Sequence, residues 1–234
     1  MQDIDIDNRY RLITPCGSGK QGTVYLAYDQ ETEREVAIKM PIGPQEYQLL
    51  ASIHHAHVPA CYDCCQVETS KALVMEWIDG ETLRSYLSRR QDPLALWEMH
   101  QIVETLCTLL FSLETQPAPI RYEDLHPGNV LRRTSDGHLF LVDFGHASWL
   151  PQDGMAARSG WLMRIFVEYD LLPHLAQGKA SHTISAWCRT LCLQGLQGSA
   201  VTVEGFYHQW VTLLETLDHV WSGPSHANLQ AVIS

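Results

Sequence analysis

The chain has 234 residues, of which 45% are hydrophobic and 18% are charged, enough apolar material for one domain or two closely packed lobes. Its 27 acidic and 16 basic side chains give a net charge of −11. No cluster of lysines and arginines is present that could neutralise a nucleic-acid backbone, so a nucleic-acid partner is excluded from our expectations.

The N-terminus alternates acidic and apolar residues, unlike the basic leader and apolar run of a signal peptide. No stretch reaches the roughly 18 apolar residues that a membrane helix needs. We therefore expect a monomer without a membrane partner, either cytoplasmic or delivered into a host cell without a signal peptide.

The seven cysteines raise the question of a zinc site. Cys61, Cys64 and Cys65 lie close together, and Cys188 and Cys192 are one helical turn apart, but the two groups are distant in sequence and lack flanking glycine knuckles. Reduced, buried thiols are the expected interpretation.

The first eighty or so residues favour strands. Short β-favouring runs broken by glycines and charged turns predict strands over 10–15, 23–28, 36–40, 60–67 and 72–78. Between the third and fourth of these, a helix is predicted over about 45–53, with Tyr47, Leu50 and Ile53 on one buried face.

From Gly80 onward the apolar spacing becomes helical. An amphipathic helix is predicted over 94–113, followed by loop and short strand over 120–150. Two further helical stripes run from Ile184 to Leu196 and from Val203 to Trp221. We predict an α+β fold with a strand-rich lobe over 1–79, a mainly helical lobe over 80–234, and a cleft between them.

A glycine-rich segment, Gly17-Ser18-Gly19-Lys20-Gln21-Gly22, lies between the first two predicted strands. A dinucleotide-binding site would need a helix directly after the glycines, whereas the following residues favour a strand. A glycine-rich turn between strands can bring backbone N–H groups close to phosphates, because no Cβ blocks the approach.

Lys39 ends the third predicted strand, where its burial requires partners for its charge. Phosphate oxygens and the carboxylate of Glu46 on the following helix would serve. Asp124, Asn129 and Asp143 come later in the chain. One carboxylate can orient an attacking hydroxyl, and the other oxygen-bearing side chains can hold magnesium on phosphates. Together these elements predict phosphoryl transfer.

In order and rough spacing, these motifs resemble the signature set of the eukaryotic-type serine/threonine protein kinases. The resemblance spans roughly residues 8–150. It implies a bilobal protein-kinase-like fold, with a small antiparallel sheet and short regulatory helix in the first lobe and a reduced helical second lobe. It also implies ATP and Mg²⁺ as cofactors and a protein as the substrate.

The resemblance also implies roles for individual residues. Asp124 is the catalytic base, Asn129 and Asp143 are magnesium ligands, and Lys39 contacts phosphates and pairs with Glu46. The residues implied to bind ATP are Cys16, Gly17, Ser18, Gly19, Gly22, Val24, Ala37, Lys39, Glu46, Met75, Glu76, Trp77, Ile78, His126 and Leu131. Among these, Met75 is the gatekeeper, and Glu76 to Ile78 meet the adenine edge.

Several positions depart from the family pattern. Glu123 stands where the family carries the arginine that reads a phosphorylated activation loop, and His126 replaces a lysine near the γ-phosphate. No A-P-E motif follows Asp143, and the remaining chain is short for a full set of C-lobe helices. Trimmed kinases of this kind resemble bacterial and effector kinases, which act without activation-loop control.

Three functions remain open from the sequence. The first is a serine/threonine protein kinase without activation-loop control. The second is a small-molecule kinase, because the string Asp124-Leu125-His126-Pro127-Gly128-Asn129 is similar to that of aminoglycoside and choline kinases. The third is a catalytically silent binding module.

Overall fold

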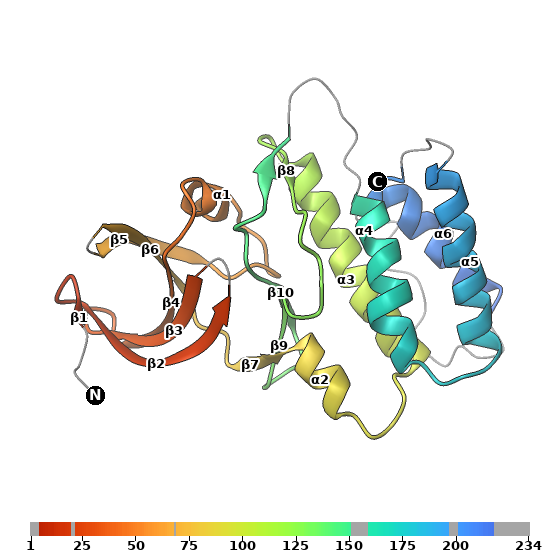
Figure 1. Cartoon of the computed structure of the whole chain (residues 1–234), viewed down its shortest axis with the longest axis horizontal. Helices are drawn as coiled ribbons and strands as arrows, with labels where there is room; N and C mark the ends of the chain where they lie inside the picture. Colours follow the sequence, from red (N-terminus) through yellow and green to blue (C-terminus); the bar gives the residue numbers. More distant parts are fainter. Residues whose placement is uncertain (1–4, 20–21, 68, 151–158, 197–200, 218–234) are drawn as a thin grey trace.

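The computed structural model describes residues 5–19, 22–67, 69–150, 159–196 and 201–217. Figure 1 shows a twisted sheet with one short helix at one end of the molecule and a group of helices at the other. Short strands lie between these two parts. Within the described residues, no helix combines the length and apolar character needed to cross a bilayer.

The first part is an antiparallel sheet of six strands in the order β1-β2-β3-β4-β6-β5. The five predicted strands are confirmed, with shifted ends; the two-residue β1 gave no readable pattern. The strands are β1 (Asp5–Ile6), β2 (Tyr10–Gly19), β3 (Gly22–Asp29), β4 (Arg34–Met40), β5 (Cys61–Val67) and β6 (Ser70–Glu76).

The alternation of side chains along β4 determines which residues face the second part of the chain. Val36 and Ile38 are buried on one face of the sheet in a small apolar cluster with Tyr10. Ala37 and Lys39 lie on the opposite face and line a large cleft. A strand of this alternating type therefore places Lys39 in the cleft without disturbing the core of the sheet.

Gly22, at the start of β3, is required by close packing. Its φ is +124°, and a Cβ at this position would lie 2.5 Å from the carbonyl oxygen of Pro41 and 3.0 Å from that of Met40. A larger residue would push the β2–β3 hairpin away from the end of β4.

Helix α1 (Glu46–Ala51) is shorter than the predicted helix over 45–53. Its buried side chains are Glu46, Leu49 and Leu50, whereas Tyr47 is only half-buried. The predicted face of Tyr47, Leu50 and Ile53 is therefore shifted, because burial of Glu46 turns the helix toward β4. Ile53 is buried beyond the helix end.

The second part is mainly helical. Its helices are α2 (Leu83–Arg89), α3 (Leu96–Thr115), α4 (Ser159–Ile165), α5 (Lys179–Leu196) and α6 (Val203–Glu215), with a π-helix over Phe166–Leu171 and a 3₁₀ turn over Leu172–His174. The predicted helices at α3, α5 and α6 are confirmed, while Trp221 lies outside the described residues. Helix α2 was not predicted.

The second part also contains short strands. They are β7 (Gly80–Thr82), β8 (Ile120–Arg121), β9 (Val130–Arg133), β10 (Leu139–Leu141) and β11 (Ser148–Trp149). Strands β10, β9 and β7 form one antiparallel sheet in that order, and β11 pairs with β8.

Helix α3 forms the centre of the larger core, and its buried residues include Met99, Val103, Leu106 and Leu110. The same cluster includes Leu49 of α1, so one continuous core joins the sheet side to the helices. This packing fixes the two walls of the cleft relative to each other.

Candidate active site

A cleft of about 700 Å³ lies between the six-stranded sheet and the second part of the chain. All the residues that the sequence assigned to the site line it. They are Cys16, Gly17, Ser18, Gly19, Gly22, Val24, Ala37, Lys39, Glu46, Met75, Glu76, Trp77, Ile78, Asp124, His126, Asn129, Leu131 and Asp143. The structure thus brings together residues spread over most of the first 143 positions.

The ammonium group of Lys39 lies between two carboxylates. Its Nζ donates to Glu46 Oε1 at 2.5 Å and to Asp143 Oδ1 at 2.8 Å. Lys39 and Glu46 are 4% and 3% exposed. The two carboxylates offset the hydration that the ammonium group loses on burial, so they hold Nζ of Lys39 in place inside the cleft.

Asp143 follows strand-forming residues and has a φ of +62°, in the left-handed region where aspartate is enriched among non-glycine residues. Its Oδ1 also accepts from the backbone N–H of Gly145 at 3.2 Å. Within the described part of the chain, Oδ2 of Asp143 has no hydrogen-bond partner.

The carboxylate of Asp124 is approached from one side by three donors. Asn129 Nδ2 donates to its Oδ2 at 3.2 Å and to its backbone carbonyl at 3.0 Å. His146 Nδ1 lies 3.3 Å from the same Oδ2, and His126 Nε2 lies 3.7 Å from it. Among the described residues, Oδ1 of Asp124 has no such partner.

The backbone defines how His126 presents its ring. The N–H of Gly128 donates to His126 Nδ1 at 3.0 Å, which makes Nδ1 an acceptor. In the neutral imidazole, the proton is then on Nε2, the nitrogen nearer to Asp124. His126 therefore offers a donor at the position where the resemblance places a lysine.

Tyr122 connects the segment that carries Asp124 to the segment that carries Asp143. Its hydroxyl donates to the carbonyl of Val142 at 2.7 Å, and its ring meets Phe144 edge-on with centroids 5.3 Å apart. Burial raises the pKa of Tyr122 well above its ordinary value, so the hydroxyl keeps its proton and its role as donor.

The side chains of the cleft are suited to bind magnesium and a nucleoside triphosphate. The side-chain oxygen of Asn129 and Oδ2 of Asp143 are hard oxygen donors without partners among the described residues, and Mg²⁺ prefers such ligands. Gly17 and Gly19 have no atom within 4 Å of the place a Cβ would occupy, which leaves open space beneath the glycine-rich turn for phosphates.

Sequence reasoning missed some of the lining residues. His146, which reaches Asp124, directly follows the Asp143-Phe144-Gly145 motif, so its position alone could have identified it. Thr82 and Ser85 also line the cleft, at the start of α2. No signal in the sequence indicated them, because α2 itself was not predicted.

Comparison with known proteins finds protein kinases similar to this chain. A family model described as protein kinase domain matches residues 10–167. The serine/threonine-protein kinase PknA of Nostoc is 32% identical over 159 residues, covering 60% of this chain and 28% of PknA. The probable serine/threonine-protein kinase SCO3848 of Streptomyces coelicolor is 28% identical over 204 residues, covering 80% of this chain and 30% of that protein.

A shorter relative is the probable serine/threonine-protein kinase YbdM of Bacillus subtilis. It is 26% identical over 163 residues, which cover 64% of this chain and 62% of YbdM. The matches to PknA, to the bean kinase PVPK-1 and to SCO3848 span 24% to 30% of those proteins. The family match extends over more than half of the chain and includes every residue of the cleft described above; the chain belongs to the protein kinase family.

Proposed function

We propose that this chain is a protein kinase that transfers the γ-phosphoryl group of ATP, with Mg²⁺, to a serine or threonine hydroxyl of a protein. One observation carries the proposal: Lys39, Asp124, Asn129 and Asp143 line a single cleft, where Lys39 donates to Asp143 and Asn129 donates to Asp124. A silent binding module would have no need of all four groups together.

Each group has a distinct role in the proposed reaction. Asp124 Oδ1 accepts the proton of the acceptor hydroxyl, because Oδ2 is already held by Asn129 and His146. Lys39, fixed by Glu46, places positive charge against the α- and β-phosphates. Asn129 and Asp143 would hold Mg²⁺, which, when bound, offsets the charge that develops on the transferring phosphoryl group.

We further propose that activity does not depend on phosphorylation of the segment after Gly145. Glu123 occupies the position next to Asp124. Arg121 Nε lies 3.1 Å from Oε1 of Glu123. A phosphate near this position would meet a carboxylate, and the neighbouring arginine is already paired.

The acceptor class is tested by incubating the purified chain with labelled ATP and magnesium in two arms. One arm contains a generic protein substrate, and the other contains a panel of amino-alcohols and aminoglycosides. We expect label in acid-stable phosphoserine or phosphothreonine of the protein. The names of PknA, SCO3848 and YbdM, which describe serine/threonine-protein kinases, support this outcome.

The two arms separate the alternatives. Label in a small molecule and none in protein would replace the protein-kinase proposal with the small-molecule one, to which the Asp124–Asn129 string also points. No label in either arm, together with no thermal shift in millimolar Mg·ATP or Mg·ADP, would support the silent binding module.

A further inference from the structure

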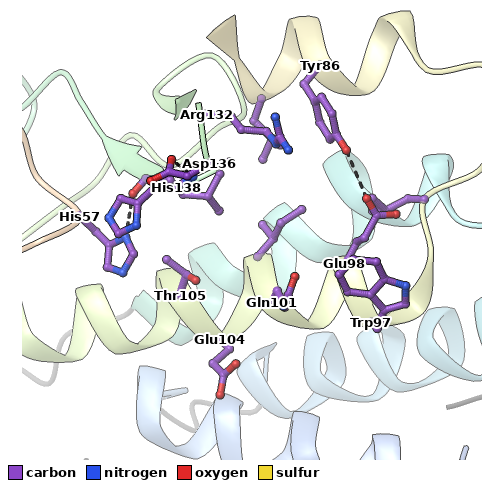
Figure 2. A pocket seen from close by; sticks show the side chains of 15 residues that line it. His57, Tyr86, Trp97, Glu98, Gln101, Glu104, Thr105, Arg132, Asp136 and His138 are labelled. Carbon is purple, nitrogen blue, oxygen red and sulfur yellow. Dashed lines mark hydrogen bonds between the residues drawn. The ribbon is translucent and has the colours of Figure 1, made fainter. Parts of the chain in front are cut away.

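A second hollow, of about 430 Å³, lies on the other side of strand β9 from the cleft. Leu131 lines the cleft, and the next residue, Arg132, lines the second hollow, since successive side chains of a strand point to opposite faces. Figure 2 shows this pocket, with Tyr86 and Arg132 on one side and Gln101 and Thr105 of α3 facing them.

The acidic side chains around this pocket are already engaged. Both oxygens of Glu98 accept from Arg90, at 2.9 and 3.0 Å. Asp136 accepts from Arg133 at 3.0 and 2.7 Å. Glu104, which also lines the pocket, lies 3.8 Å from His100 Nε2. Glu98 and Asp136 are thus both paired with guanidinium groups, which offsets their negative charge at the pocket.

The contacts of Arg132 differ from those of the carboxylates around the pocket. Its guanidinium stacks on the ring of Tyr86, 4.5 Å from the centroid, and lies close to Gly137, where an added Cβ would be 2.8 Å from Nη2. Among the described residues, the guanidinium makes no hydrogen bond and no ion pair within 4 Å, although its charge helps Arg89 to lower the pKa of Glu81. The nearby carboxylate of Glu81 is held by both Nε and Nη2 of Arg89.

We propose that this pocket docks an acidic segment of a partner protein, with a glutamate or aspartate carboxylate paired to Arg132. A planar guanidinium pairs with a carboxylate through two parallel hydrogen bonds. Stacking on Tyr86 restricts the orientation of the Arg132 guanidinium, so less side-chain entropy is lost when a carboxylate binds. The volume is that of a site for a few side chains, and Trp97, 39% exposed, borders it with apolar surface.

The net charge of −11 does not prevent this pairing, because exposed charges beyond about 8 Å are screened at physiological ionic strength. Gln101 and Thr105 on α3 are neutral and polar and can donate hydrogen bonds to a peptide, while Leu83, Leu94, Ile102 and Leu139 add apolar surface to the lining. The proposed docking does not depend on the proposed phosphoryl transfer, since the pocket and the cleft lie on opposite faces of β9.

The test is isothermal titration calorimetry of the whole chain with capped eight-residue peptides that contain two glutamates, two glutamines or two lysines at the same positions. We expect the glutamate peptide alone to bind, and Arg132→Gln to weaken its binding at least tenfold. Arg34→Gln is the matched control, because Arg34 also stacks on a tyrosine, Tyr62, at 3.8 Å, but lines neither this pocket nor the cleft; it should leave the affinity unchanged.

A second variant, Thr105→Glu, places a carboxylate on the opposite wall and should repel the glutamate peptide even if Arg132→Gln does not fold. Mg·ADP affinity, measured on each variant, should stay within twofold of the parent, so failure here is separable from failure of the kinase proposal. No binding of the glutamate peptide at millimolar concentration, equal binding by Arg132→Gln, or preference for the lysine peptide would overturn the proposal. Tighter binding of citrate or inorganic phosphate than of any peptide would overturn it as well.

Discussion

The ammonium group of Lys39 is buried between Glu46 Oε1 at 2.5 Å and Asp143 Oδ1 at 2.8 Å. Glu46 is as deeply buried as Lys39, and its Oε2 has no hydrogen-bond partner among the described residues. The pair is therefore balanced only while both members are present, because a buried charge without a counter-charge is strongly destabilising.

Replacing Lys39 with methionine should lower the free energy of unfolding by about 3 kcal/mol, since Glu46 would remain buried without its partner. The double variant Lys39→Met/Glu46→Gln removes both charges and should recover most of this loss. Urea denaturation of the parent, the single variant and the double variant measures both values. A double variant no more stable than the single one would show that Glu46 does not depend on Lys39 for its burial.

Two histidines connect the loop before β5 to the β9–β10 hairpin. The carbonyl of Leu139 lies 2.7 Å from His57 Nδ1, and the carbonyl of Ala56 lies 3.0 Å from His138 Nε2. The rings of His57 and His138 stack with centroids 4.2 Å apart. Burial lowers the pKa of His55 and of His57 below 6.5, and neighbouring histidines lower both further.

These histidine contacts should make the free energy of unfolding depend on pH. The folded state favours neutral His55 and His57, so their contribution is fully present above pH 6.5 and is lost as pH falls through the lowered pKa values. The free energy of unfolding should therefore decrease from pH 7.5 to pH 5. In His57→Gln, which keeps a hydrogen-bond donor without a titrating ring, the decrease should be smaller. Denaturant titrations at several pH values measure it, and parallel slopes for parent and variant would contradict the interpretation.

Elements differed in how well the sequence predicted them. Many of the cleft residues could be predicted because they lie in short motifs of fixed order, as with Asp143-Phe144-Gly145, whereas Thr82 and Ser85 lie in no such motif. Helix α2 could not, because its buried residues, Leu83 and Leu87, give only one helical repeat. The contact of His57 with Leu139 joins positions 82 apart, and no local pattern encodes such a pairing. The stacking of Arg132 on Tyr86 was hidden for the same reason.

A phosphorylation switch on activity would act through the segment that follows Asp143. Ser159 is 1% exposed, and the hydroxyl of Ser148 is buried without a hydrogen-bond partner in the described chain. Arg158, a conceivable phosphate reader, lies outside the described residues. Neither serine side chain is accessible to a modifying enzyme in this arrangement.

Replacing both Ser148 and Ser159 with alanine should leave the initial rate of phosphoryl transfer within twofold of the parent. Phosphatase treatment of the parent should have equally little effect, because neither hydroxyl makes a bond that the site requires. Both are measured with labelled ATP under initial-rate conditions. A tenfold fall after either manipulation would mean that a cation reads a phosphate there, with Arg121 or Arg158 as the first residues to examine.

The rate of Asp143→Ala tests whether the cleft containing Lys39, Asp124, Asn129 and Asp143 transfers a phosphoryl group. Loss of a magnesium ligand removes several kcal/mol of transition-state stabilisation, so kcat should fall by about a thousandfold. The thermal midpoint should stay close to that of the parent, and the exposed control Asp92→Ala should keep full activity. Transfer by Asp143→Ala within threefold of the parent would contradict the account.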